Sequence, residues 1–141
     1  MTICYLGVGA NLGDRRNNIA LAVKKINQLS DTRIVRAAKI IETEALGGPK
    51  TQPKFLNTVL KIKTKLGPQV LLRKLKKIER ELGRKKTARR YGPRPIDLDI
   101  LFYADRIVNT KNLKIPHPKI FQREFVLGPL SELLESKVLG R

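Results

Sequence analysis

Two carboxylates, Asp97 and Asp99, stand two positions apart in a segment that otherwise has the composition of a buried strand. Because alternate side chains of a strand share a face, both acids point one way and their apolar neighbours point the other. Like charges on one strand face repel each other, and a hard cation such as Mg²⁺ is the usual reason for such a pair. Arg90 and Arg94 precede it, and arginine binds phosphate oxygens in bidentate fashion. The segment predicts a site for a metal-bound polyphosphate; the competing interpretation is a solvated strand end.

Hydrophobic periodicity and turn residues predict the elements that position this segment. We expect helices over 15–29, with Asp14 as N-cap, and from Gly67-Pro68 to a terminating Gly83. Strands are expected, besides the one that carries the aspartates, over 3–8, 32–44, 55–66, 106–109 and 112–115. Loops are expected over 9–13, 45–54 and 84–90, and short helical segments near 119–122 and 131–134. The order β-α-β-β-α-β predicts an α+β sandwich with helices on one face of a mainly antiparallel sheet.

The composition indicates one globular domain over residues 1–141 with an unusual charge. Lys and Arg number 30 against 12 Asp and Glu, a formal net charge of +18, and such a field attracts polyanions. A nucleic-acid-binding module is therefore the alternative function, although aromatic residues make up only 5% and offer few stacking platforms. No membrane-length apolar run or signal peptide is visible, so a soluble cytoplasmic protein is expected. Cys4 lies in an apolar run and is interpreted as a small buried hydrophobe.

Several features have ordinary interpretations when taken singly. The glycines from Gly7 to Gly13 follow a strand and precede a helix, but their last spacing is one residue longer than the dinucleotide fingerprint. The basic run over 84–90 is by itself a solvated charged segment, and His117, between two prolines, is by itself structural. Phe55 and Phe125 are by themselves core residues. Only the combination of these features indicates a specific function.

Six segments in order resemble one family, the 6-hydroxymethyl-7,8-dihydropterin pyrophosphokinases of folate biosynthesis. They are Gly9–Arg15, Thr43–Gly47, Gln52–Asn57, Arg90–Leu101, Ile115–His117 and Arg123–Phe125. The resemblance implies a ferredoxin-like α+β fold. It also implies transfer of the β,γ-diphosphoryl unit of ATP to the pterin hydroxymethyl oxygen, with AMP as the other product. Most of the catalysis would then be positioning and electrostatic stabilisation.

The resemblance also implies roles residue by residue. Two Mg²⁺ ions would be held by Asp97 and Asp99, and the catalytic set would be Arg84, Lys86, Arg94, Asp97 and Asp99. The implied ATP site comprises Leu72, Lys76, Glu79, Arg84, Arg90, Arg94, Ile100, Lys114 and His117. The implied pterin site comprises Thr43, Ala45, Leu46, Phe55, Asn57, Tyr91, Arg123 and Phe125.

Departures from the family pattern include two positions of the implied pterin site. Tyr91 stands where many relatives carry tryptophan, and Ala45 replaces a frequent proline. The expected partners are the small molecules ATP and 6-hydroxymethyl-7,8-dihydropterin, with neither a membrane nor a nucleic acid. The protein is expected to be a monomer.

Overall fold

The computed structural model describes residues 1–44, 53–83, 94–118, 129–131 and 133. Along the chain the elements are β1 (Thr2–Ala10), α1 (Arg15–Asn27), β2 (Thr32–Ala37), β3 (Ile41–Thr43), β4 (Phe55–Thr64), α2 (Pro68–Glu81), β5 (Asp97–Tyr103), β6 (Val108–Asn109) and β7 (Lys114–Ile115). No helix within these ranges is long and apolar enough to cross a membrane.

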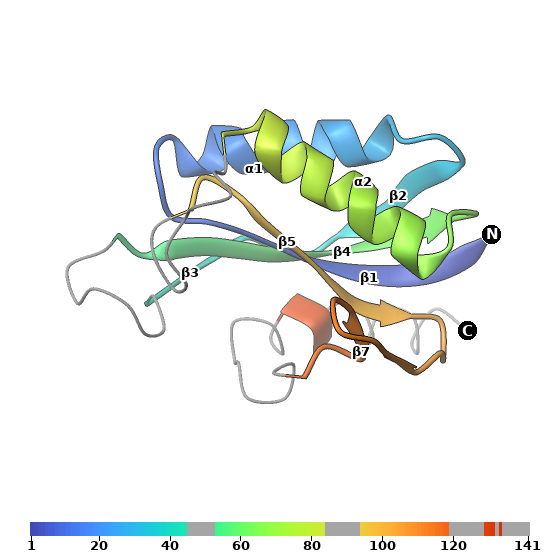
Figure 1. Cartoon of the computed structure of the whole chain (residues 1–141). Coiled ribbons are helices and arrows are strands. Elements are labelled where there is room, and N and C mark those ends of the chain that lie inside the picture. Colours follow the sequence, from blue (N-terminus) through green and yellow to red (C-terminus); the bar gives the residue numbers. More distant parts are fainter. Residues whose placement is uncertain (45–52, 84–93, 119–128, 132, 134–141) are drawn as a thin grey trace.

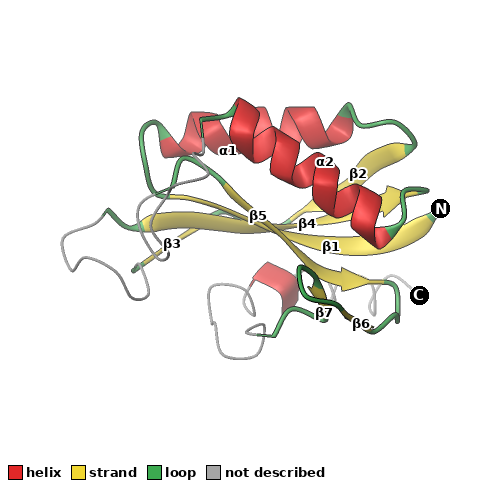
Figure 2. Ribbon diagram, in the orientation of Figure 1, coloured by secondary structure: helices red, strands yellow, loops and turns green. Residues whose placement is uncertain are grey.

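A five-stranded antiparallel sheet forms the centre of the fold, in the order β2-β4-β1-β5, with β3 also paired to β4. Helices α1 and α2 lie side by side over one face of this sheet, as Figures 1 and 2 show. Strands β6 and β7 form a separate two-stranded ribbon. The predicted α+β class and the helices on one face are therefore confirmed.

Local sequence signals account for both helices. The Asp14 side chain accepts a hydrogen bond from the Asn17 N–H at 3.1 Å, which satisfies one of the free amides of the first turn of α1. Pro68 is the first residue of α2, where its missing N–H is not needed. Gly83 follows α2 with φ +100°, a conformation that glycine adopts without strain.

The core lies on both faces of the sheet. Between sheet and helices, one core cluster joins the alternate β1 residues from Cys4 to Ala10 with Ile19 and Ile26 of α1 and Leu71 and Leu75 of α2. On the opposite face a smaller cluster contains Tyr5, Ala38, Val59, Leu101, Leu130 and Leu133. Residues 129–131 and 133 are helical, in partial agreement with the short helix expected near 131–134. The helix expected near 119–122 falls outside the described residues.

The single strand expected over 32–44 is wrong, because the chain forms β2 and β3 instead. Ala37 pairs with Leu60 and Ile41 pairs with Asn57, so three residues, 38–40, stand opposite only two of β4. The mismatch interrupts the ladder, as a bulge does. The expected loop over 9–13 also starts too early, since β1 continues through Ala10. Helix α1 ends two residues before the expected Leu29, and β4 two before Leu66.

The buried thiol of Cys4 should not react in the folded protein. Burial raises the pKa of Cys4 from 9.0 to about 12, because the thiolate would lose its hydration. The thiol therefore favours the folded state at every pH below 9, and this contribution is lost as the pH rises toward 12. We expect no labelling by a disulfide reagent at pH 8 in native buffer and full labelling in denaturing urea. Rapid labelling of the native protein would contradict this burial.

Candidate functional site

Three strands bring predicted site residues from distant parts of the chain into one row. Gly9 of β1 pairs with Asn57 of β4 on one side and with Asp97 of β5 on the other. Directly paired residues of antiparallel strands point to the same face. Because glycine has no side chain, no β1 side chain stands between Asn57 and Asp97, and the interval between these two residues above Gly9 is here called the gap. A residue from the predicted pterin site and one from the predicted metal site therefore flank the same gap.

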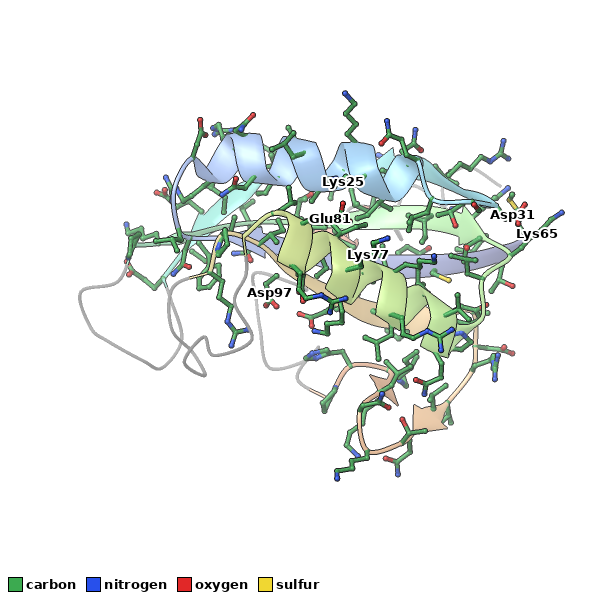
Figure 3. All side chains as sticks on the ribbon, turned by 45° about the horizontal axis from the view of Figure 1, so that its top comes forward. Lys25, Asp31, Lys65, Lys77, Glu81 and Asp97 are labelled. Atoms are coloured by element: carbon green, nitrogen blue, oxygen red, sulfur yellow. The ribbon has the colours of Figure 1, made fainter. Side chains whose placement is uncertain are left out.

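The two aspartates lie on the sheet face turned away from the helices, as the alternation predicted. Ile96, Leu98 and Ile100 are buried in the core under the helices. The side chains of Asp97 and Asp99 are 24% and 32% exposed. Asp97 lies at the start of β5, near the end of α2 (Figure 3). Two hard carboxylates thus stand on one accessible strand face, in the orientation that the metal prediction requires.

Arg94 lies directly in front of the acidic strand and contacts its first residue. Its guanidinium Nη1 is 3.5 Å from Asp97 Oδ1, and the side chain is 18% exposed. The buried Nε of Arg94 has no hydrogen-bond partner within the described part of the chain. A buried donor without a partner is unfavourable, and an anion bound here would remove that penalty. The geometry fits the predicted role of Arg94 as a phosphate ligand.

A bulge in β5 brings His117 to the other aspartate. Tyr5 pairs with Phe102 while Leu6 pairs with Ile100, so Leu101 is the extra residue of β5. The freed carbonyl of Leu101 accepts the His117 N–H at 3.1 Å. This bond holds the imidazole beside the strand, with His117 Nε2 3.9 Å from Asp99 Oδ1. The structure therefore brings His117 into the group of Arg94, Asp97 and Asp99.

Asn57 and Thr43 form the other side of the gap. The Asn57 Nδ2 donates to Thr43 Oγ1 at 2.7 Å, and Thr43 pairs with Phe55 across β3 and β4. The Oδ1 of Asn57 and the ring of Phe55 both lie close to Gly9, at 2.8 and 3.5 Å from the place where a Cβ would stand. Two of the predicted pterin residues therefore lie next to Gly9, and Thr43 holds one of them.

Glu79 of α2 contributes a structural bond that the sequence did not indicate. Its carboxylate, only 3% exposed, accepts the Leu98 N–H at 2.8 Å through Oε2 and lies 3.3 Å from Lys76 Nζ through Oε1. Strand β5 is at the edge of the sheet, so its outward amides have no neighbouring strand. Glu79 ties α2 to the residue between the two aspartates. Its expected role, with Lys76, in nucleotide binding stays a prediction.

The remaining described residues of the predicted ATP site are more dispersed. Ile100 is buried in the core and Leu72 packs against it. Lys114 is exposed on β7 and donates to Asn109 Oδ1 at 2.7 Å. Eight predicted site residues lie outside the described ranges, and their roles stay predictions: Ala45, Leu46, Arg84, Lys86, Arg90, Tyr91, Arg123 and Phe125.

Sequence reasoning missed two residues at the gap. Gly9 was expected in a loop, and Asn11, quoted only as part of a family motif, was given no role. Both follow from the unexpected length of β1, which carries Gly9 into the paired region and leaves Asn11 buried at its end. The composition of this segment, rich in glycine and asparagine, favoured a loop, and strand pairing overrides that preference.

The donor set suits Mg²⁺ that arrives with a substrate. Within the described residues no group of three or more His, Cys, Asp or Glu side chains could enclose a metal ion. Mg²⁺ binds through one or two carboxylates and completes its shell with water and substrate phosphates. Asp97 and Asp99, with Arg94 beside them, meet that requirement.

A cavity elsewhere contains none of the predicted site residues. Its volume is about 450 Å³, and it lies at the start of α1. An ion pair between Arg15 and Glu42, with 2.8 Å between Nη1 and Oε2, spans part of its lining. The complete lining is Gly13, Asp14, Arg15, Arg16, Ile40, Glu42 and Leu56.

An α+β fold in which two carboxylates, an arginine and a histidine meet at one end of the sheet is typical of a protein that handles a metal-bound polyphosphate. Comparison with known proteins identifies the family. Residues 5–135 match the model of the 7,8-dihydro-6-hydroxymethylpterin-pyrophosphokinase family. The chain belongs to this family, and it is an ATP-dependent pyrophosphokinase.

Individual relatives agree. A 2-amino-4-hydroxy-6-hydroxymethyldihydropteridine pyrophosphokinase of Aquifex aeolicus is 45% identical over 94% of this chain and 81% of its own length. The enzyme of the same name from Haemophilus influenzae is 41% identical over 99% of this chain and 86% of its own. A solved structure of HPPK-DHPS in complex with substrates superposes with a TM-score of 0.68 at 15% identity, over 93% of this chain and 40% of that one. The structural likeness supports the ferredoxin-like fold.

Replacing Gly9 with alanine should disturb the gap, whereas the same change at Gly7 should not. An alanine Cβ at position 9 would stand 2.8 Å from Asn57 Oδ1, so Asn57 would have to turn away from Thr43. At Gly7 the nearest atom is a Leu101 methyl group at 3.4 Å, which can yield. We expect Gly9→Ala to lower the free energy of unfolding by about 1–3 kcal/mol and Gly7→Ala by less, measured by urea denaturation. Equal effects would argue against a close Gly9–Asn57 contact.

Removing the Glu79 carboxylate should destabilise the edge of the sheet. Glu79→Ala leaves the Leu98 N–H and the Lys76 ammonium without their acceptor, so we expect a loss of about 2–4 kcal/mol. Glu81→Ala is the matched control, since Glu81 on the same helix forms an exposed ion pair with Lys25 at 3.2 Å (Figure 3). That change should stay within about 0.5 kcal/mol. Thermal and urea unfolding of both variants check the difference.

Proposed function

We propose that the chain catalyses its family's reaction at the gap above Gly9, with ATP on the β5 side and the pterin on the β4 side. The diphosphoryl group of ATP passes to the hydroxymethyl group of 6-hydroxymethyl-7,8-dihydropterin, and AMP is released. The observation that carries this proposal is the row of Asn57, Gly9 and Asp97 on three adjacent strands. Phosphoryl transfer needs donor and acceptor within about 3–3.5 Å of each other, and binding sites on these adjacent strands allow that approach.

On the β5 side, Asp97 and Asp99 would hold Mg²⁺ bound to the triphosphate, and Arg94 binds phosphate oxygens. When bound there, Mg²⁺ would supply positive charge against the phosphate charge that develops in the transition state. The Arg94 guanidinium adds a fixed positive charge, and its Nε donor, which lacks a partner among the described residues, faces no competing acceptor there. His117 beside Asp99 is a further donor for a phosphate oxygen.

On the β4 side, Asn57 and Phe55 receive the flat pterin ring. Asn57 supplies both a donor and an acceptor to the polar edge of the ring, and Phe55 supplies an apolar face. Because Thr43 already accepts from Asn57 Nδ2, the orientation of the Asn57 amide is set before the pterin binds. The hydroxymethyl oxygen then attacks the β-phosphorus and gives its proton to water. A new oxygen–phosphorus bond forms, and the bond from the β-phosphorus to the α,β-bridging oxygen breaks, so that this oxygen leaves on AMP.

Finer parts of the proposal rest on the family resemblance. They are the second Mg²⁺ ion and the contributions of Arg84, Lys86, Arg90, Tyr91, Arg123 and Phe125. A single domain over residues 1–141, a monomeric state and a cytoplasmic location belong to the same proposal. The family assignment gives no support to the alternative of a nucleic-acid-binding module.

The reaction itself and two aspartate variants test the proposal. With ATP, Mg²⁺ and the hydroxymethyl dihydropterin, the protein should form AMP and the pterin diphosphate, separated by ion-exchange chromatography. Asp97→Asn and Asp99→Asn should each lower turnover by about 10²-fold or more, because a neutral amide binds Mg²⁺ weakly. Formation of ADP, or no turnover by the unmodified protein, would contradict the proposal.

Asp105→Asn is the control, because Asp105 is exposed in the turn after β5 and takes no part in the proposed site. It should keep full turnover. Near-normal turnover of either Asp97→Asn or Asp99→Asn would refute the proposal that these two carboxylates together hold Mg²⁺. The family assignment would stand.

A further inference from the structure

Asn11 occupies the position where the central strand ends. Strand β1 pairs with β4 up to Ala10 and with β5 up to Gly9, and Asn11 follows with none of its surface exposed. A fully buried carboxamide has a donor group and an acceptor atom that both need partners. The partners of Asn11 lie on two different segments that lead into the proposed site.

On the β5 side, Asn11 bonds Arg94 twice. The Asn11 N–H donates to the Arg94 carbonyl at 3.0 Å, and the Arg94 N–H donates to Asn11 Oδ1 at 2.7 Å. Both bonds involve the Arg94 backbone, so they fix where its side chain starts. That side chain then reaches Asp97, three residues further along.

On the β4 side, Asn11 forms a hydrogen bond with the segment that leads into β4. Its Nδ2 donates to the Pro53 carbonyl at 3.1 Å, two residues before Phe55. The same side chain thus joins the start of β4 to the approach to β5, across the end of the strand that separates them.

Proline explains why a side chain is needed at this point. Pro53 and Pro95, which lie near the ends of the two neighbouring strands, have no N–H to donate to a sheet ladder. In the register of β1 and β5 Pro95 stands opposite Asn11, so regular pairing beyond Ala10 is impaired on that side. The Asn11 carboxamide replaces it with one accepted and one donated bond.

We propose that Asn11 is a positioning residue for both substrates, acting on the nucleotide side through Arg94 and on the pterin side through Pro53 and Phe55. This inference rests on the proposed function, because it uses the site residues assigned there. Asn11 itself touches the backbone of these segments and needs no contact with either substrate. Because the Asn11 amide accepts a bond from Arg94 and donates one to Pro53, its effects on nucleotide binding and on pterin binding can be tested separately.

Two variants of Asn11 separate the effect on nucleotide binding from the effect on pterin binding. Asn11→Ala removes the side-chain bonds to Arg94 and Pro53, so affinity should fall for both substrates. Asn11→Asp keeps the acceptor for the Arg94 N–H, but a carboxylate cannot donate to the Pro53 carbonyl. Asn11→Asp should therefore weaken pterin binding by about tenfold or more while nucleotide affinity changes less than threefold, since small displacements of substrate-binding groups have effects of this size.

Calorimetry on the full chain, well below the unfolding temperature, provides the measurement. The probes are ATP with a methylene group between its α- and β-phosphorus atoms, with Mg²⁺, and then 6-hydroxymethylpterin in the presence of that analogue. Asn27→Ala is the matched control, since Asn27 Oδ1 accepts the Ile34 N–H at 2.9 Å far from the gap. It should leave both affinities unchanged, even if it lowers the unfolding temperature.

Every result of these measurements either supports or overturns the proposal. Loss of both affinities in Asn11→Ala, with the split in Asn11→Asp, supports the proposal. A folded Asn11→Ala that binds both probes as the unmodified protein does would overturn it. If Asn11→Ala does not fold, Asn11→Asp decides alone, and equal effects on both probes, or none, overturn the proposal. Failure of the proposed function is distinguishable, because the unmodified protein would then bind neither probe.

Discussion

The pairing of β1 with β4 on one side and β5 on the other is the constraint on which the site depends. Asn57 and Asp97 lie on the two strands that flank Gly9. Because neighbouring strands lie about 4.8 Å apart, the backbones of these two residues are held about 10 Å from each other. A shift of one residue in either pairing would turn Asp97 or Asn57 into the core. Leu98 and Ile100, buried on the other face, resist that shift. The apolar core thereby sets the geometry of the polar site.

The polar groups of the site are held because each has a specific neighbour. Arg94 stands beside Asp97, His117 beside Asp99, and Lys76 beside Glu79. The exposed edge of β5 would otherwise offer free amides to another strand, but Glu79 accepts the Leu98 N–H. The bulge at Leu101 uses a further carbonyl to hold His117. Irregularities of the sheet edge thus position the functional side chains, and the regular centre provides rigidity.

Local signals predicted the part of the fold that depends on neighbours in sequence. Alternation correctly gave the faces of Asp97 and Asp99, and Asp14 and Pro68 correctly marked helix starts. The break between β2 and β3 and the approach of His117 to Asp99 depend on the register of other strands, so periodicity could not supply them. Gly9 was misplaced for the same reason. The family resemblance supplied most of the predicted site residues. It assigned no role to Asn11, because an asparagine that binds backbone groups cannot be recognised from its residue type alone.

The net charge and the small number of carboxylates have a common consequence for metal binding. A protein of +18 repels free divalent cations and attracts anions, so Mg²⁺ bound to ATP approaches more readily than Mg²⁺ alone. Asp97 and Asp99 are too few to hold a bare ion firmly, and no third acidic, histidine or cysteine ligand joins them within the described residues. In the proposed reaction, triphosphate oxygens supply the missing ligands. Under that proposal the two features make metal binding depend on nucleotide binding, so the carboxylates next to Arg94 receive the metal together with the nucleotide.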